Sequence, residues 1–275
     1  MKLSMTSLMG GFTSEIDCTL RMDLGDCLGI MATLPDNSVD LVLCDLPYGT
    51  TKCKWDVLIP FEPMWEQIWR IGKPDVAVCL FGAEPFSSSL RMSQLKWFKY
   101  DWVWDKVTAR GHLVAKKMPM AQHETVSVFY KKAGRYTPQM VDRPVDKQEV
   151  HRATDKGFKR SEIVGGNNDG PKSEMVLRKT WYPKTIQTFS NAALPNRLHP
   201  TQKPVPLLEY LIKTYTKEKE TVLDFTAGSF STGVAAMNLS RSFIGIESDK
   251  DYFNAGKKRI SEESKNKQIH LTINE

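Results

Sequence analysis

One short segment constrains the fold more than any other part of the chain. Residues 39–45 read VDLVLCD, an almost unbroken apolar run that is too short for a typical helix. A strand that is apolar on both sides of its pleat must be covered on both faces, as the strands of parallel sheets are. The run follows a short strand, a Gly-Asp turn and a helix that we expect to end near Leu34. This order predicts an α/β fold with a doubly wound, mostly parallel sheet.

The same alternation continues along the chain. Further strands are expected at 75–81, 99–105 and 124–130, and helices at 62–72 and 85–95. A second group near the C-terminus comprises a strand at 221–225, a helix at 231–239, a strand at 241–247 and a closing helix at 249–264. Between the two groups, residues 133–195 carry many turn signals and show poor apolar periodicity. We therefore expect two α/β halves separated by an insert.

The basic charge of the protein is concentrated in this insert. The 275-residue chain has a net charge of +6, and residues 131–190 alone hold 13 Lys or Arg against 7 Asp or Glu. Aromatic residues are interleaved with the basic ones, at Tyr136, Phe158, Trp181 and Tyr182. This pattern suits contacts to phosphates and bases. It predicts a nucleic-acid contact module, although a solvated, partly mobile loop region would have a similar composition.

Composition also argues against several classes of protein. No apolar run reaches the length of about 18 residues that would indicate a membrane span, and the N-terminus has no apolar segment typical of a secretory signal. The five cysteines form no CxxC pair and have no His partner at zinc spacing. We expect a cytoplasmic protein with reduced thiols and without a structural metal.

The C-terminal group contains a turn with the features of a nucleoside site. Asp224 lies at the end of one strand, a loop of small residues follows, and the next strand ends in Glu247. Sheets of this kind bind nucleotides at the carboxyl ends of their strands, where an acidic residue accepts hydrogen bonds from ribose hydroxyls. A nicotinamide-binding GxGxxG motif is the obvious alternative, but Phe230 stands where its second glycine would let a pyrophosphate approach. A nucleoside without phosphates is favoured, and a simple tight turn is the remaining alternative.

The strand at 39–45 ends in a second notable motif, Asp45-Leu46-Pro47-Tyr48. Pro47 has a fixed φ and biases Leu46 toward an extended conformation, so the carbonyl of Leu46 has a defined direction. A carboxylate, a fixed carbonyl and an aromatic face suit the exocyclic amine of a nucleobase. That amine is a poor nucleophile until hydrogen bonds from both its N–H groups free its lone pair from the ring. Taken alone, the four residues also fit a strand end with a local Asx turn.

Together, the motifs resemble the S-adenosylmethionine-dependent DNA amino-methyltransferases, which modify adenine N6 or cytosine N4. Residues 45–48 resemble the family's catalytic motif, Asp/Asn/Ser-Pro-Pro-Tyr/Phe. DFTAGSFSTG (224–233) and FIGIE (243–247) resemble its cofactor motifs, and HPTQKP (199–204) resembles a further motif on the cofactor side. The catalytic motif precedes the cofactor motif, an order similar to the family's permuted β group.

The resemblance implies a Rossmann-like methyltransferase fold with an inserted target-recognition region. Residues 1–132 would form the catalytic half of the methyltransferase domain, 133–195 the target-recognition insert and 196–275 the cofactor-binding half. The implied cofactor is S-adenosylmethionine and the implied partner is double-stranded DNA, with neither a membrane nor a metal required. A homodimer is compatible with the resemblance.

The residue roles that the resemblance implies fall into two sets. Asp45 and the carbonyl of Leu46 would accept from the target amine, Pro47 would set the geometry, and Tyr48 would stack on a base flipped out of the duplex. The cofactor would contact Asp26, Thr201, Gln202, Lys203, Asp224, Ala227, Gly228, Ser229 and Glu247, with Glu247 on the ribose hydroxyls and Asp26 near the adenine.

The expected activity is site-specific methylation of adenine N6 in DNA, because Asp45 stands where serine would favour cytosine in this family. Cytosine-N4 methylation and a catalytically inactive DNA-binding relative are the alternatives. Three residues depart from the family pattern. Leu46 replaces the first proline of the catalytic motif, and Phe225 and Phe230 replace the usual Pro and Gly of the cofactor turn. These departures put the shape of the cofactor pocket, the cofactor affinity and the activity in question.

Overall fold

The computed structural model describes residues 18–50, 56–145, 149–152, 159–160, 166–167, 175–190, 202–265 and 270–274. The strands of its main sheet are β1 (Thr19–Leu24), β2 (Val39–Asp45), β3 (Gly72–Gly82), β4 (Phe98–Arg110), β5 (Ala121–Phe129), β12 (Ile186–Thr188), β13 (Thr221–Asp224), β14 (Ser242–Glu247) and β15 (His270–Asn274). The helices are α1 (Cys27–Thr33), α2 (Phe61–Ile71), α3 (Phe86–Ser93), α4 (Val205–Tyr215), α5 (Ser231–Asn238) and α6 (Lys250–Ser264), with a short 3₁₀ helix, η1 (His112–Val114).

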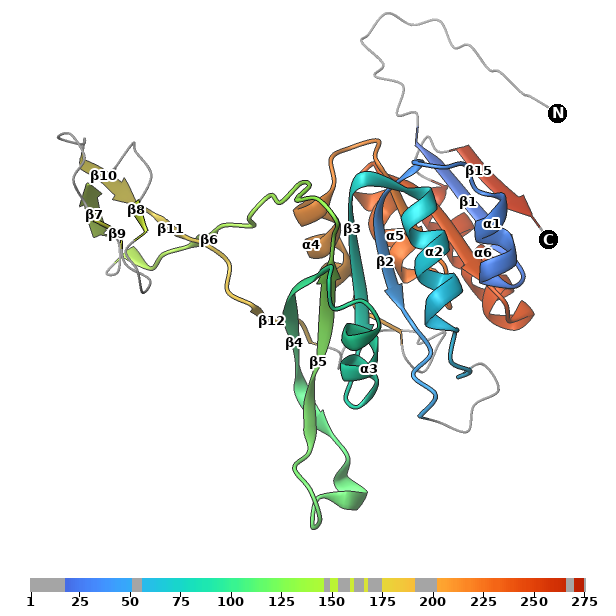
Figure 1. Ribbon diagram of the computed structural model, residues 1–275, viewed down its shortest axis with the longest axis horizontal. Coiled ribbons are helices and arrows are strands. Elements are labelled where there is room, and N and C mark those ends of the chain that lie inside the picture. The colour runs from blue at the N-terminus through green and yellow to red at the C-terminus, as the bar shows by residue number, and fades with distance from the viewer. Residues whose placement is uncertain are drawn as a thin grey trace, which may run out of the picture. The chain divides into compact units, whose positions relative to one another are not determined.

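The sheet is mostly parallel, with the strand order β12-β4-β5-β3-β2-β13-β14-β1-β15 (Figure 1). The strands from β3 through β2, β13, β14 and β1 to β15 run parallel to one another, and β12 runs parallel to β4. Strand β5 is antiparallel to both β3 and β4, since it returns from β4 through a hairpin. The predicted fold class, an α/β fold with a doubly wound and mostly parallel sheet, is confirmed.

Both faces of the sheet are buried, as the apolar run at 39–45 requires. Leu41 and Leu43 of β2 belong to one apolar cluster, which α4, α5 and α6 cover. The alternate residues Val42 and Cys44 belong to a second cluster, which α1, α2 and α3 cover. Successive side chains of a strand point to opposite faces, so an all-apolar strand becomes stable only when helices pack on both sides.

The elements expected from the sequence are present within three residues of their predicted ends, except β4, which continues to Arg110. Two strands of the main sheet were missed. Strand β15, HLTIN, alternates polar and apolar residues over five positions and pairs with β1, and β12 is a three-residue segment that pairs with β4. Each is too short for its pattern to identify a strand, and each lies at an edge of the sheet, where pairing with its neighbour specifies it. Among the described residues, no helix combines the length and apolar character needed to cross a bilayer.

The chain divides into two compact units, one of which spans Pro138–Lys184. Within this smaller unit the described strands form three antiparallel pairs: β6 (Val141–Asp142) with β11 (Thr180–Trp181), β7 (Glu149–Arg152) with β10 (Met175–Arg178), and β8 (Lys159–Arg160) with β9 (Gly166–Asn167). Arg143 lies over the ring of Trp181, 5.4 Å from its centroid. Basic and aromatic side chains are therefore already paired within this unit, while Phe158 lies outside the described residues.

Candidate active site

A cavity of about 490 Å³ opens at the carboxyl edge of the parallel strands. Its size is typical of small-ligand sites. Twelve of the residues predicted from the sequence line it: Asp26, Asp45, Leu46, Pro47, Tyr48, Gln202, Lys203, Asp224, Ala227, Gly228, Ser229 and Glu247. Thr201, the remaining predicted residue, lies outside the described residues. The topology explains the convergence, because β1, β2, β13 and β14 are parallel neighbours whose carboxyl ends meet at one edge.

Glu247 is fixed at the end of β14 by backbone donors on both sides. The N–H of Gly228 donates to its Oε2 atom at 2.7 Å, and the N–H of Asp249 donates to its Oε1 atom at 2.8 Å. Burial raises the pKa of Glu247 in spite of these hydrogen bonds. Gly228 has a φ of +52°, a conformation that suits glycine at this tight turn. The carboxylate is thus preorganised to accept further hydrogen bonds from a ligand in the cavity.

Asp224 holds the turn between β13 and α5. The hydroxyl of Thr232 donates to its Oδ2 atom at 2.6 Å, and the N–H of Thr226 donates to its Oδ1 atom at 3.2 Å. Burial raises the pKa of Asp224 to about 7. Both carboxylate oxygens are therefore engaged in shaping the loop that forms one wall of the cavity.

Phe230 does not enter the cavity. Its side chain is fully buried and packs edge-to-face on Phe243 and Phe253, with ring centroids 6.2 and 5.9 Å apart. Gly245 and Gly256 make room for the ring, because a Cβ atom at either position would come within 2.5 Å of it. The backbone of Phe230 has a positive φ of 56°, which turns the side chain into the core. The concern that Phe230 reshapes the pocket is therefore wrong, whereas Phe225 does line it.

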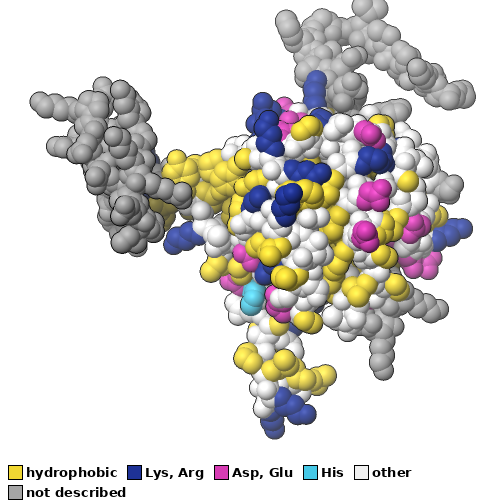
Figure 2. Space-filling view, in the orientation of Figure 1, with side chains coloured by type: hydrophobic (Ala, Val, Ile, Leu, Met, Phe, Trp, Pro, Cys, Tyr) yellow, Lys and Arg dark blue, Asp and Glu magenta, His cyan; other side chains and the backbone are white. Residues whose placement is uncertain are grey.

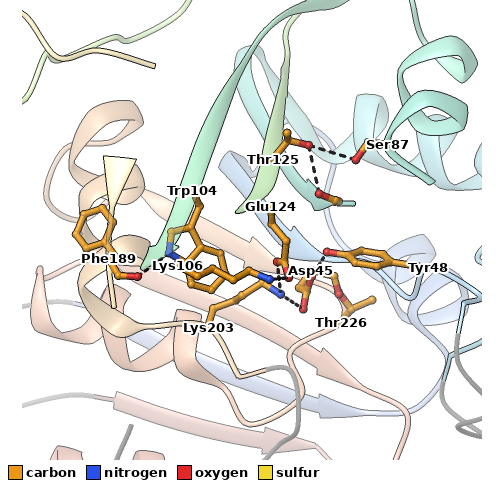
Figure 3. Close-up of polar contacts among 11 residues, drawn as sticks. Asp45, Tyr48, Ser87, Trp104, Lys106, Glu124, Thr125, Phe189, Lys203 and Thr226 are labelled. Atoms are coloured by element: carbon orange, nitrogen blue, oxygen red, sulfur yellow. Dashed lines mark hydrogen bonds and ion pairs between the residues drawn. The ribbon is translucent and has the colours of Figure 1, made fainter. Parts of the chain in front are cut away.

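Asp45 accepts hydrogen bonds from two side chains, one on each carboxylate oxygen (Figure 3). The hydroxyl of Tyr48 donates to Oδ1 at 2.8 Å, and the Nζ atom of Lys203 donates to Oδ2 at 2.5 Å. The hydroxyl of Thr226 donates to the backbone carbonyl of Asp45 at 3.0 Å, which ties the end of β2 to the turn after β13. The ring of Tyr48 stacks on Phe86 with centroids 4.9 Å apart.

The structure adds two charged residues that the sequence analysis missed. Glu124 of β5 lies 3.4 Å from the Nζ atom of Lys203, and Lys106 of β4 pairs with the same glutamate. Figure 3 shows both ammonium groups converging between Asp45 and Glu124. Only the register of β4 and β5, which places Trp104 opposite Glu124, reveals this approach. A glutamate at the start of an otherwise apolar strand was the only signal available in the sequence.

Burial dominates the electrostatics of this cluster. Burial raises the pKa of Asp45; Lys203 opposes that effect and Glu124 reinforces it. Burial also works against ionisation of Lys203, but Asp45 and Glu124 outweigh it and raise the pKa of the ammonium. Burial, together with Asp45, raises the pKa of Tyr48 well above its ordinary value. Lys203 therefore stays charged, and Tyr48 stays a hydrogen-bond donor, at every pH at which the protein would operate.

The charge of the cavity indicates which ligand fits. Among the described residues that line it, Lys203 is the one cation and six are carboxylates: Asp26, Asp45, Asp56, Glu124, Asp224 and Glu247. Such a lining repels a pyrophosphate and attracts a cationic ligand. The nicotinamide alternative is therefore disfavoured on electrostatic grounds. A nucleoside that carries positive charge matches both the strand-end acids and the overall sign of the cavity.

A doubly wound sheet, a carboxylate motif at a strand end and an acidic cavity suited to a nucleoside together indicate an enzyme that binds a nucleoside cofactor at the carboxyl edge of its sheet. The family model described as DNA methylase, N6_N4_Mtase, matches residues 39–258. The chain belongs to this family, and the suspected kinship with DNA amino-methyltransferases is confirmed.

The chain shares only low sequence identity with individual relatives. The chain is 26% identical to the Type II methyltransferase M2.LlaDCHI of Lactococcus lactis subsp. cremoris, over 86% of this chain and 87% of the relative. A crystal structure of the M1.HpyAVI–SAM complex superposes with a TM-score of 0.56 and 23% identity, covering 88% of this chain and 99% of the other. The PvuII DNA methyltransferase, described as cytosine-N4-specific, gives a TM-score of 0.62 and 16% identity, covering 94% and 97%.

Proposed function

We propose that the protein is an S-adenosylmethionine-dependent DNA methyltransferase that modifies the N6 amine of adenine. The observation that carries this proposal is the position of Asp45. Its carboxylate lies at the carboxyl end of β2, in the same cavity as the Gly228 turn and Glu247. A methyl acceptor bound at Asp45 and a nucleoside donor bound at Glu247 would therefore share one cavity.

The residues of the cavity fit this cofactor. Glu247 would hold the ribose hydroxyls, and the backbone around Ala227, Gly228 and Ser229 would enclose the amino-acid portion. Asp26, which caps α1 by accepting from the N–H of Gly29 at 2.8 Å, lies at the rim where the adenine would bind. When bound, S-adenosylmethionine supplies a methyl group that its sulfonium has already activated. The acidic lining complements the positive charge of that sulfonium.

The residues around Asp45 would prepare the target amine. A base flipped out of the duplex would stack on Tyr48 and donate its two N–H groups to the Asp45 carboxylate and to the Leu46 carbonyl. The amine nitrogen forms the bond to the methyl carbon, the carbon–sulfur bonding pair stays with sulfur, and one N–H proton leaves to solvent. Positioning and exclusion of water account for the catalysis that these side chains provide.

The finer assignments follow from the same proposal. Adenine is favoured because Asp45, rather than serine, begins the catalytic motif. The compact unit at 138–184, with its paired Arg143 and Trp181, is proposed as the element that reads the target sequence. The cytoplasmic location and the homodimer stay predictions.

Mass spectrometry of nucleosides tests the proposed function. Unmethylated genomic DNA is incubated with the protein and S-adenosylmethionine and then digested. We expect N6-methyldeoxyadenosine from the wild-type protein and at least about a 100-fold loss, or about 2.7 kcal/mol of transition-state stabilisation, for Asp45→Ala. Asp36→Ala is the matched control, because Asp36 is an exposed carboxylate on the loop after α1.

The product distinguishes the alternatives. N4-methyldeoxycytidine would preserve the mechanism and correct the base. Cofactor binding without any methylated nucleoside would refute the proposed activity and favour an inactive DNA-binding relative. Calorimetric titration of S-adenosylmethionine into the wild-type protein and into Glu247→Gln separates these cases, since the variant should bind about tenfold more weakly through loss of one charged acceptor.

A further inference from the structure

The hairpin formed by β4 and β5 projects beyond the edge of the sheet. Strand β3 ends at Gly82, opposite Thr125 of β5, whereas β4 continues to Arg110 and β5 begins at Ala121. The projecting part, residues 107–123, is the light-green hairpin at the bottom of Figure 1. It leaves the sheet at the carboxyl edge, where Asp45 also lies, and we call it the hairpin arm.

The base of the hairpin arm is part of the active-site cluster. Lys106, the last residue before the arm, pairs with Glu124, the first residue after it. Glu124 in turn contacts Lys203, which donates to Asp45. The arm therefore rises directly from the charged cluster beside the catalytic motif, and whatever binds there lies next to the arm.

A β-bulge sets the direction of the hairpin arm. The pairing of β4 with β5 shifts register between Asp105 and Arg110, and Val107 has a φ of +68°. A β-branched residue in this conformation is strained. Asp105 supports it, because its Oδ1 atom accepts from the N–H of Val107 and from the side chain of Gln122, both at 2.9 Å. Bulges of this kind are common next to active sites, where they redirect a strand.

The tip of the arm is folded rather than open. Gly111 adopts a φ of +103°, and the η1 turn follows it. The N–H of Val114 donates to the carbonyl of Gly111 at 3.0 Å, and the N–H of Lys117 donates to the carbonyl of Val114 at 2.8 Å. These bonds present a preformed knob, which would lose little conformational entropy on binding.

The surface of the tip combines positive charge with apolar side chains. Arg110, Lys116 and Lys117 are exposed, and no Asp or Glu occurs from 106 to 123. Leu113 is fully exposed, and Met118 is more than half exposed. Figure 2 shows dark-blue and yellow side chains together at the lower end of the molecule. An exposed apolar residue among cations, with no acidic residue nearby, is complementary to a duplex, whose phosphates surround an apolar base stack.

We propose that the hairpin arm is a DNA-binding element, in which Arg110, Lys116 and Lys117 contact phosphates and Leu113 packs as a wedge against the base stack beside the flipped nucleotide. The proposal rests on the proposed function. Arg110 lies five residues beyond Asp105, so the arm extends about 17 Å past the sheet edge at about 3.3 Å per residue. The grooves of B-DNA are only about 8 Å deep, so the arm is long enough to enter one.

Salt-dependent DNA binding tests the cationic part of the arm. Fluorescence anisotropy with a mixed-sequence duplex is measured for the wild type and for Arg110→Ala/Lys116→Ala/Lys117→Ala. Loss of three phosphate contacts should reduce the slope of log K against log salt by about 2.7. Between 50 and 200 mM salt, the wild-type affinity should thus fall about 40-fold more than that of the variant. Lys213→Ala/Lys217→Ala/Lys258→Ala removes the same charge from exposed positions on and after α4 and on α6, and should retain the wild-type slope.

A separate variant tests the wedge. Leu113→Ala should keep the salt slope but lower by at least about fivefold the fluorescence increase of 2-aminopurine placed at the target base, which reports flipping. Leu95→Ala is the matched control, since Leu95 is another exposed leucine, located between α3 and β4. Unchanged 2-aminopurine fluorescence in Leu113→Ala would refute the wedge.

The outcomes separate this inference from the proposed function. If the triple variant of Arg110, Lys116 and Lys117 binds DNA with the wild-type salt slope, the proposal that the hairpin arm binds DNA is refuted, even if the wild-type protein methylates DNA. A wild-type protein that binds DNA through the arm without methylating it overturns the proposed function alone. Sedimentation velocity tests whether the tip of the hairpin arm binds a second copy of the chain instead. If Leu113→Ala turns a dimer into a monomer while DNA binding is unchanged, the tip is a dimer contact and the DNA-binding proposal is refuted.

Discussion

Replacement of Lys203 by methionine offers the sharpest test of the charged cluster. The lysine side chain is only 7% exposed and lies between two carboxylates, 2.5 Å from Asp45 Oδ2 and 3.4 Å from Glu124 Oε2. Methionine keeps much of the length and volume of the side chain and removes its charge. The change therefore leaves Asp45 buried next to Glu124 without its neutralising partner.

The expected effect follows from Coulomb's law. Two unit charges about 4 Å apart attract by about 4 kcal/mol at an effective dielectric constant of about 20. Since a pKa changes by one for about 1.4 kcal/mol, loss of Lys203 should raise the pKa of Asp45 by about two to three. Asp45 must be ionised to accept hydrogen bonds from both sides, so the acidic limb of the methylation profile should move up by the same amount. At a pH below both pKa values, the activity of the variant should then be about 100-fold or more lower than that of the wild type, and it should recover at a pH above the shifted limb.

The assay is the pH dependence of kcat for transfer of a radiolabelled methyl group to DNA. Lys106→Met is the matched control, because Lys106 contacts Glu124 rather than Asp45, and its profile should shift by less than about one pH unit. Addition of Glu124→Gln to Lys203→Met should restore part of the lost activity, since the repelling charge is removed as well. A Lys203→Met profile that is lowered equally at every pH would refute the electrostatic explanation and leave a merely structural role.

Three further substitutions test other parts of the site. Tyr48→Phe removes the hydroxyl that donates to Asp45 but keeps the ring, so kcat should fall about tenfold in steady-state kinetics with KM for DNA unchanged; an equal loss in Tyr48→Ala would contradict a role for the ring. Phe230→Leu should lower the free energy of unfolding in urea by about 1–2 kcal/mol without changing the calorimetric affinity for S-adenosylmethionine, because the ring lies in the core; a weakened affinity would place it in the pocket. The pKa of Asp224 is raised to about 7 in the native state, so between about pH 4 and 7 the folded protein holds a proton that the unfolded chain releases. The free energy of unfolding should therefore fall as pH rises through this window. Asp224→Asn should flatten that fall in urea melts, and an unchanged pH dependence would argue against it.

The convergence of the candidate site residues could be predicted from the sequence. The DLPY motif, the Gly228 turn and Glu247 follow apolar strands in the sequence, and parallel strands bring their carboxyl ends to one edge. The twelve described candidates therefore line one cavity. The placement of Phe230 could not be predicted, because it depends on a positive φ and on the space left by Gly245 and Gly256, one on a neighbouring strand and one on a helix.

The sequence by itself determined the α/β sheet, the order of its elements and the strand ends that carry the motif residues, because these depend on local periodicity and on turn residues close along the chain. Only the tertiary structure decided which charges meet. Lys203 reaches Asp45 across 158 positions, and Glu124 joins them through the register of β4 and β5. Interactions of this kind are set by side-chain packing between distant segments, which leaves no periodic signal in the sequence. The length and direction of the hairpin arm belong to the same category, since a bulge and a strained valine determine them.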